Sequence, residues 1–212
     1  MYRMQIGAQV RNRLVATPGV MKVPAIGLDL FVCRDFLPLA DCAALIKQID
    51  ADRAPSKLLA TDPDPEFRTS ETCNLDARAA LTKKVESRIS HFMGINPAHG
   101  ETIQGQRYAV GQQFKYHHDF FYTTEPYWAE QEKVGGQRTW TVMIFLNAPE
   151  AGGHTNFLKA KVKITPRAGN LLTWNNLDEF GEPNQNSLHQ GEPVEAGTKY
   201  IITKWYRERP WG

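Results

Sequence analysis

The stretch Phe114-Lys-Tyr-His-His-Asp-Phe-Phe121 is rich in aromatic residues and predicts a β-strand. Because side chains alternate between the two faces of a strand, we expect His117 and Asp119 to point one way and His118 the other. An imidazole and a carboxylate on one face can hold a metal ion from one side. A second imidazole would complete a set of two histidines and one carboxylate that leaves positions open on the metal. The stretch therefore predicts a metal site that needs one more histidine.

The second imidazole is expected from His189, within Ser187-Leu-His-Gln-Gly191. It lies 70 residues after Asp119 in the penultimate predicted strand, which fits a barrel in which a late strand returns beside an early one. A histidine two residues before an aspartate also occurs by chance in many strands, and the alternative is a surface histidine with a nearby acid. His189 favours the metal site, but spacing alone leaves both interpretations open.

The chain after Glu101 has the pattern of a barrel or a double-sheet jelly roll. Short runs of β-branched and aromatic residues are separated by Gly and Pro turns, as in antiparallel all-β folds. Residues 122–137 form a longer polar loop after the His-Asp strand, where we expect a lid over a pocket. The predicted strands are 102–110, 113–120, 139–147, 153–157, 162–165, 170–174, 187–193 and 198–207.

The first hundred residues are predicted to support this core with helices. Apolar residues at helical spacing predict a helix over about 39–51. Asp76 is the expected N-cap of a second helix that runs to about Met93. The remaining predicted elements are a strand over 26–33, a surface loop over 52–66 and a short strand over 68–75, while residues 1–23 give no clear pattern.

Length and composition predict one globular domain. The 212 residues are enough for one well-filled core, and 42% hydrophobic and 23% charged residues are ordinary for a soluble protein. The predicted fold class is mainly β with flanking helices: a double-sheet core supported by N-terminal α-helices. We expect a single domain over 1–212, with helical support over about 1–100 and a jelly-roll core over about 101–208.

Charge and cysteines limit the expected partners and compartment. The net charge of +2, from 25 basic and 23 acidic residues, is too balanced to indicate a nucleic-acid partner. No apolar run predicts a membrane span, and the start of the chain lacks the apolar core of a signal peptide. The three cysteines cannot all pair and none lies in a CxxC motif, so we expect a reduced, cytoplasmic protein. The oligomeric state stays open.

A further feature is Lys199, ten residues past His189 on the adjoining last predicted strand. A buried ammonium is costly unless an anion pairs with it. One interpretation is that Lys199 pairs with the distal carboxylate of a dicarboxylate co-substrate. The alternative is an edge-strand lysine that points to solvent, which is common.

These residues together resemble the 2-oxoglutarate- and Fe(II)-dependent dioxygenases, and specifically the prolyl 4-hydroxylase group. The resemblance covers roughly residues 65–207 in ordered blocks. The blocks are Arg68-Thr-Ser70, Gln106 to Phe121, Arg138 to Leu146, Gly152-Gly-His-Thr-Asn-Phe157, Gly169-Asn-Leu-Leu-Thr-Trp174, and Ser187-Leu-His189 through Lys204-Trp-Tyr206.

The resemblance implies a double-stranded β-helix with a catalytic Fe(II) site. Its metal ligands would be His117, Asp119 and His189. The implied co-substrates are 2-oxoglutarate and O2, with L-ascorbate as reductant. Lys199 would bind the 5-carboxylate of 2-oxoglutarate, and two further matching residues, Tyr108 and Thr141, would help to hold it.

The substrate site is less well defined by the resemblance. Trp205 matches a family position near the pocket, and Arg68, Ser70 and Arg138 could meet the substrate backbone or a carboxylate. Each of these last three could equally lie in a surface salt bridge. His154 and other residues of its block depart from the usual family sequence, and the cysteines of animal collagen hydroxylases are absent, so a collagen substrate is not expected.

Three functional hypotheses follow. The leading one is hydroxylation of a prolyl residue in a peptide or protein, coupled to conversion of 2-oxoglutarate to succinate and CO2. The second keeps this chemistry but takes a free amino acid or another small metabolite. The third is a cupin-like metal-binding protein without turnover, against which Lys199 and Tyr108 argue because a simple metal site needs no anchor for a dicarboxylate.

Overall fold

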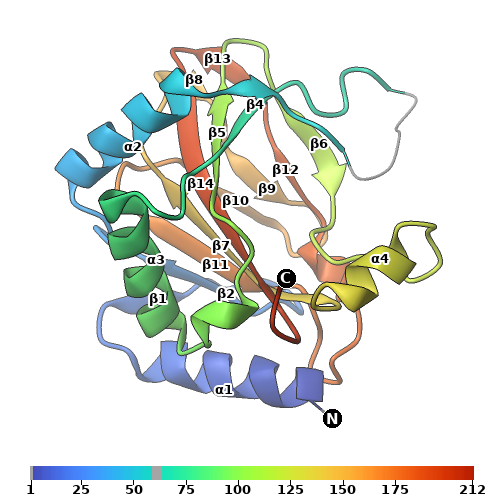
Figure 1. Cartoon of the computed structure of the whole chain (residues 1–212). Coiled ribbons are helices and arrows are strands. Elements are labelled where there is room, and N and C mark those ends of the chain that lie inside the picture. The colour runs from blue at the N-terminus through green and yellow to red at the C-terminus, as the bar shows by residue number, and fades with distance from the viewer. Residues whose placement is uncertain (1, 59–63) are drawn as a thin grey trace.

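A computed structural model describes residues 2–58 and 64–212 of the chain (Figure 1). Four α-helices and two short 3-10 helices accompany the strands in this part of the chain. The helices are α1 (Tyr2–Ala16), α2 (Leu39–Ala51), α3 (Ala80–Met93), η1 (Pro97–His99), α4 (Trp128–Lys133) and η2 (Gln185–Ser187). The strands are β1 (Val20–Lys22), β2 (Leu30–Cys33), β3 (Ala54–Pro55), β4 (Glu71–Asn74), β5 (Gln104–Tyr108), β6 (Phe114–His117), β7 (Arg138–Phe145), β8 (Ala151–Gly152), β9 (Thr155–Phe157), β10 (Val162–Ile164), β11 (Leu171–Asn175), β12 (His189–Gly191), β13 (Val194–Ala196) and β14 (Lys199–Arg207).

Two antiparallel sheets form the core. The larger has the order β1-β2-β11-β7-β14-β5-β4-β3, and the smaller has the order β10-β9-β12-β6. A two-stranded sheet, β13-β8, completes the set. The predicted mainly β fold, a double-stranded β-helix (jelly roll) with supporting helices, is confirmed. The functional consequence is that the inner faces of the two sheets can share one pocket.

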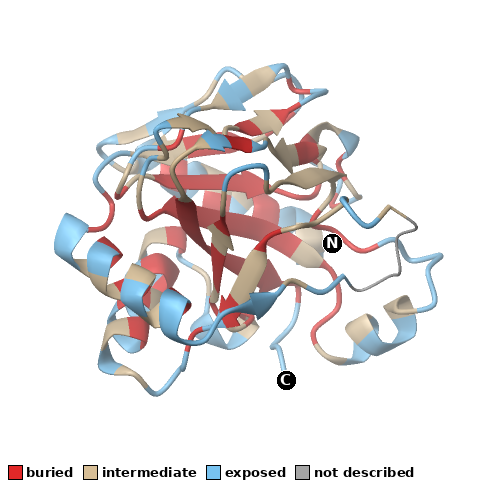
Figure 2. Cartoon of the chain, turned by 90° about the horizontal axis from the view of Figure 1, so that it is seen from above, coloured by how far each residue is buried: buried red, intermediate tan, exposed pale blue. Residues whose placement is uncertain are grey.

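The alternation of side chains along β7 divides the interior into two layers. Trp140 and Ile144 point to the side covered by the helices, where they pack with residues such as Leu45 of α2 and Ile89 of α3. Phe145 points to the other side and packs with residues of the smaller sheet, Phe157 among them. Figure 1 shows α2 and α3 on the side of the large sheet away from β6, β9 and β12, and Figure 2 shows the buried strands between these layers.

Gly105 of β5 allows α2 to lie close to the sheet. A Cβ atom added at this position would meet Ile49 Cγ1 at 2.3 Å, which is closer than atoms can approach. Ile49 itself is fully buried. The glycine therefore sets the distance between α2 and the large sheet.

Several predicted boundaries differ from the structure. Helix α1 was not predicted, because only Gly7, Val10 and Leu14 of its residues are buried and its apolar pattern is weak. Helix α3 begins four residues after Asp76: the Asp76 carboxylate accepts a hydrogen bond from the Arg78 N–H at 2.9 Å and so forms a local turn instead of a cap.

The strands expected over 26–33 and 187–193 are both shorter in the structure than predicted. The strand expected over 26–33 begins at Leu30, since Gly27 adopts a positive φ of 60° in a turn. The strand expected over 187–193 is divided into η2 and β12. The loop expected over 122–137 contains the short helix α4, which Figure 1 shows projecting beside β6.

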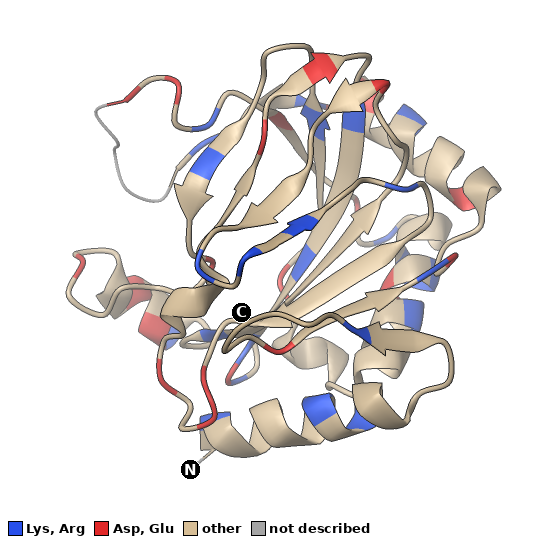
Figure 3. Ribbon diagram, turned by 180° about the vertical axis from the view of Figure 1, so that it is seen from behind, with Lys and Arg blue, Asp and Glu red and all other residues tan. Residues whose placement is uncertain are grey.

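Basic and acidic residues are interspersed along the ribbon in the view from behind (Figure 3). Within the described ranges, no helix is both long and apolar enough to cross a lipid bilayer.

Candidate functional site

His117 and His189 face each other across neighbouring antiparallel strands. His117 is the last residue of β6 and His189 the first of β12, and their Cα atoms are direct partners in the ladder. Their ring centroids lie 4.3 Å apart. The predicted return of a late strand beside an early one therefore brings the two imidazoles together.

Asp119 joins them from beyond the end of the strand. The predicted strand ran to residue 120, but β6 ends at His117, so simple alternation does not place this carboxylate. Instead the chain turns after β6, and the side-chain amide of Gln137 fixes the turn. Its Oε1 accepts a hydrogen bond from the Phe121 N–H at 2.7 Å, and its Nε2 donates one to the Phe121 carbonyl at 2.8 Å. Asp119 Oδ1 lies 3.8 Å from His117 Nε2, and ligand atoms of the three residues lie within 4.8 Å of one another.

The two imidazoles are held in one orientation by the backbone. His117 Nδ1 lies 2.7 Å from the Lys115 carbonyl oxygen, and His189 Nδ1 lies 2.9 Å from the Ser187 carbonyl oxygen. A carbonyl can only accept, so each Nδ1 carries the proton and each Nε2 keeps its lone pair. Phe114 stacks on His117, with ring centroids 3.5 Å apart, and limits its rotation.

Electrostatics favour the deprotonated forms that metal ligands need. Burial, with a contribution from His189, lowers the pKa of His117 to about 3. Burial alone would raise the pKa of Asp119, but the neighbouring His189 and His117 lower it further than burial raises it. A neutral imidazole beside an ionised carboxylate fits a divalent metal with two nitrogen ligands and one oxygen ligand.

Lys199 lies in the sheet opposite the histidines. It begins β14, between β7 and β5 in the large sheet, whereas the sequence placed it on a strand adjoining that of His189. The edge-strand alternative is wrong, because Lys199 is 1% exposed. Burial lowers the pKa of Lys199 to about 7, although the negative charge of Glu192 acts in the opposite direction. Glu192 itself pairs with Lys163, its carboxylate 2.8 Å from that ammonium.

The pocket between the sheets contains polar atoms without partners. Three buried donors in its lining make no hydrogen bond within the described part of the chain: Thr155 Oγ1, Trp174 Nε1 and Trp205 Nε1. Together with the Lys199 ammonium they form a cradle for an acidic, oxygen-rich molecule beside the His-Asp-His cluster. The lining also includes Tyr108, Met143, Ile201 and Thr203. The residues present therefore fit both a metal ion and a dicarboxylate.

Tyr108 and Thr141, the two further residues implied to hold the co-substrate, differ in their position relative to the pocket. Tyr108 lines the pocket, is 3% exposed, and donates its hydroxyl hydrogen to Gln106 Oε1 at 2.9 Å. Thr141 is outside the pocket lining, and its hydroxyl donates to Asp119 Oδ2 at 2.7 Å. The structure thus gives Thr141 a different contact from the one implied. Thr155 was missed, although it stands in the Gly-Gly-His-Thr-Asn-Phe block.

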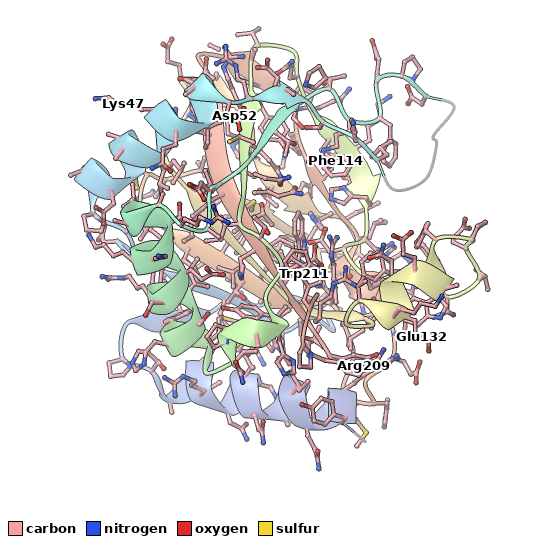
Figure 4. All side chains as sticks on the ribbon, in the orientation of Figure 1. Lys47, Asp52, Phe114, Glu132, Arg209 and Trp211 are labelled. Atoms are coloured by element: carbon pink, nitrogen blue, oxygen red, sulfur yellow. The ribbon has the colours of Figure 1, made fainter. Side chains whose placement is uncertain are left out.

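A wider groove of about 790 Å³ opens over the His-Asp-His cluster and includes His117 and Asp119 in its lining. The segment after β6 and α4 form one wall, with Tyr122, Tyr127 and Gln131. The predicted lid segment therefore lines this groove. Figure 4 labels Phe114, Glu132 and Trp211, which mark β6, α4 and the C-terminal segment in the side-chain view.

Arg138 and Trp205 are both at this groove. Arg138 forms two hydrogen bonds to the buried Glu101 carboxylate, at 2.6 and 2.7 Å, and its guanidinium lies 4.1 Å from the Trp205 ring. The salt bridge considered for Arg138 exists, but it is buried and not on the surface. Arg207 donates to the same carboxylate at 2.5 Å, so one acid holds two arginines.

Arg68 and Ser70 take different positions. Arg68 lines the groove, with its guanidinium 4.7 Å from the Phe114 ring, and donates to neutral oxygens, among them Lys57 O at 3.1 Å. Ser70 is 2% exposed, and its hydroxyl lies 2.9 Å from Ser56 Oγ. Of the four expected substrate contacts, three line the groove and Ser70 supports its wall.

Comparisons with known proteins point to one family. A model of the 2OG-Fe(II) oxygenase superfamily matches residues 103–207. The chain is 29% identical over 200 residues to "Probable prolyl 4-hydroxylase 8" of Arabidopsis thaliana, covering 83% of this chain and 67% of the relative. It is 30% identical over 159 residues to the prolyl 4-hydroxylase subunit alpha-1 of Gallus gallus, covering 71% of this chain but only 31% of that subunit.

A solved structure shows the same fold. The viral collagen prolyl hydroxylase of Paramecium bursaria Chlorella virus-1, in its 2OG complex, superposes with a TM-score of 0.65 at 26% sequence identity. The match covers 84% of this chain and 94% of that one.

Proposed function

Because this chain belongs to the 2OG-Fe(II) oxygenase superfamily, in its prolyl 4-hydroxylase group, we propose that it hydroxylates a prolyl residue of a peptide or protein. The enzyme is a 2-oxoglutarate-dependent dioxygenase. When Fe(II) and 2-oxoglutarate are bound, they supply the oxidation, in which 2-oxoglutarate becomes succinate and CO2 while one oxygen atom of O2 enters a substrate C–H bond. L-Ascorbate is the proposed reductant.

The observation that carries the proposal is the Lys199 ammonium, which is buried opposite the His-Asp-His cluster and forms no salt bridge within the described residues. A buried charge without a counterion is costly, so such a residue is retained where a ligand supplies the opposite charge. A cupin-like metal protein would gain nothing from this lysine. A dicarboxylate that reaches from Lys199 to the metal position gives it a role.

We assign roles to the pocket residues on this basis. His117, Asp119 and His189 hold Fe(II) through their Nε2 and carboxylate atoms. Lys199 receives the distal carboxylate of 2-oxoglutarate, and the unpartnered Thr155 hydroxyl is available to donate to the same group. The aromatic residues of the lining exclude water from the metal position.

The groove supports a peptide substrate. Its volume of about 790 Å³ exceeds what a single free amino acid needs and suits an extended segment. Aromatic side chains along it, Tyr122 and Tyr127, offer flat faces for proline rings. Arg68 stands at the groove beside Phe114, with donors for a substrate carbonyl.

The test is turnover with a peptide library. The protein is incubated with Fe(II), 2-oxoglutarate, O2 and L-ascorbate, succinate release is measured, and peptides are searched by mass spectrometry for one added oxygen atom on proline. His117→Ala and Asp119→Ala should abolish succinate release while circular dichroism stays unchanged. Succinate release stimulated only by small metabolites would overturn the peptide proposal. Tight zinc binding without any turnover would overturn the enzyme assignment of this site.

A further inference from the structure

We propose that Thr141 and Asn176 are positioning residues, which together hold one oxygen atom of Asp119 so that the other faces the metal. The proposal rests on the proposed function, because it takes Asp119 as a metal ligand. Neither residue belongs to the His-Asp-His cluster. We call the chain of hydrogen bonds from Asn176 through Thr141 to Asp119 the relay.

The two oxygen atoms of Asp119 have different surroundings. Oδ2 accepts the Thr141 hydroxyl hydrogen at 2.7 Å, whereas Oδ1 lies 3.8 Å from His117 Nε2. Oδ1 is therefore the atom on the side of the imidazoles. A carboxylate held at Oδ2 offers one ligand atom and not two, which leaves more positions open on a metal.

Asn176 fixes the direction of the relay. Its Nδ2 lies 2.9 Å from Thr141 Oγ1. The threonine hydroxyl has one hydrogen, which Asp119 requires, so Thr141 must accept from the Asn176 amide. If the amide were turned over, its oxygen would compete for this hydrogen, and the oxygens of Thr141 and Asp119 would face each other without a proton.

The relay is rigid and buried. Thr141 and Asn176 are both fully buried. Thr141 lies on β7 between two paired strands, and Asn176 is fixed by its backbone, which donates to Thr139 O at 2.8 Å and accepts from the Asn184 N–H at 3.0 Å. These backbone hydrogen bonds therefore hold Asn176 beside Thr141, where its side chain donates to the threonine hydroxyl.

The arrangement has a cost that a purely structural role does not explain. Asn176 Oδ1 is buried without a hydrogen-bond partner in the described residues. An unmet buried acceptor destabilises a fold. An apolar residue at this position would avoid that loss. The amide is retained, we infer, because its Nδ2 is needed to direct the Thr141 hydroxyl toward Asp119.

Asp119 needs this support because of its position. It follows the end of β6, so no ladder hydrogen bond of its own strand fixes its direction. The two histidines have backbone carbonyls that orient their rings, and the relay does the same for the carboxylate.

The experiment measures Mn(II) binding to the metal-free protein by calorimetry, without turnover. Thr141→Val removes the hydroxyl at nearly constant volume, and we expect the affinity to fall by about 10- to 100-fold, the usual effect of losing a partner of a metal ligand. Thr141→Ser keeps the hydroxyl and should stay close to the unmodified protein. Asn176→Ala should weaken binding in the same direction as Thr141→Val.

Thr139→Val is the matched control. Thr139 lies two residues earlier on β7 and is also buried, but its hydroxyl donates to the Tyr206 carbonyl at 3.1 Å and does not reach Asp119. It should lower thermal stability without changing Mn(II) affinity. In the Co(II)-loaded protein, the visible spectrum should change in Thr141→Val and Asn176→Ala but not in Thr139→Val.

The outcomes separate the two proposals. If folded Thr141→Val binds Mn(II) as tightly as the unmodified protein, the relay is refuted while the metal site stands. Should Thr141→Val fail to fold, Asn176→Ala decides by the same measurement. If the unmodified protein binds no Mn(II), the metal site and the relay are both refuted.

Discussion

Lys199 and Tyr108 are cross-strand partners in the β14–β5 ladder, and the Lys199 ammonium lies 5.2 Å from the centre of the Tyr108 ring. A second ring, that of Phe145, lies 5.8 Å from the same ammonium. Aromatic faces attract a cation, but only weakly compared with a carboxylate. The two rings are therefore only weak partners for the ammonium, and an anionic ligand can stabilise it further.

Lys199→Met is expected to separate co-substrate binding from folding. Removing one partner of a buried charge pair costs about 2–5 kcal/mol, so the KM for 2-oxoglutarate should rise at least about 30-fold. The metal-free, ligand-free protein should melt at the same or a higher temperature, because the change removes a buried charge that forms no salt bridge with any residue the structure describes. Steady-state kinetics and calorimetry check both parts. An unchanged KM would remove Lys199 from its role.

The stability of the ligand-free protein should rise with pH above neutrality. Burial lowers the pKa of Lys199 to about 7, below that of an unfolded lysine, so the unfolded chain binds more protons between about pH 7 and 10. The free energy of unfolding should then increase by up to about 1.4 kcal/mol per pH unit in this window. Urea denaturation at several pH values measures the slope. Lys199→Met should flatten it, and an equal slope in both proteins would contradict the prediction.

Glu101→Gln is expected to destabilise the protein strongly. Burial raises the pKa of Glu101, but Arg138 and Arg207 lower it further, so the carboxylate is charged and holds both arginines. Neutralising it removes the carboxylate with which both guanidinium groups form their salt bridges in the described residues, at a cost of about 3–5 kcal/mol. Asp41→Asn, which breaks a surface pair with Lys84, is the control and should cost at most about 1 kcal/mol. Equal losses in denaturant unfolding would refute the prediction.

The aromatic wall of the groove should affect the binding of the peptide and not the binding of the co-substrate. Tyr127→Ala removes a ring that lines the groove away from the pocket between the sheets. We expect a higher KM for a prolyl peptide with an unchanged KM for 2-oxoglutarate. Phe180→Ala, at an exposed residue outside the groove lining, is the control. A rise in the KM for 2-oxoglutarate with an unchanged KM for the peptide would contradict a role of Tyr127 in peptide binding.

Gly105→Ala should test the packing of α2 against the large sheet. The added methyl group would overlap Ile49, and overpacking of this kind costs about 1–3 kcal/mol. Ile49→Ala alone should also destabilise, because it opens a cavity. In the double variant the two losses should not add, since the new methyl group occupies part of that cavity. Additive losses in denaturant unfolding would show that the two residues do not share this space.

The sequence predicted more of the site than of its surroundings. His117, Asp119 and His189 were found because the spacing of two residues and a late strand are visible in the chain. The helix predicted over about 39–51 from apolar spacing is α2, Leu39–Ala51. Helix α1 was missed because it buries few apolar residues, so helical periodicity is faint in its sequence.

Residue types and their spacing along the chain determined the fold class, the His-Asp-His set and the presence of an unusual lysine. The tertiary structure decided which groups meet. It placed Lys199 in the sheet opposite His189, engaged Thr141 with Asp119, left Thr155 facing the pocket, and buried Arg138 against Glu101. The physical reason is that strand periodicity is a local property, whereas contacts across two packed sheets depend on how strands far apart in sequence are paired.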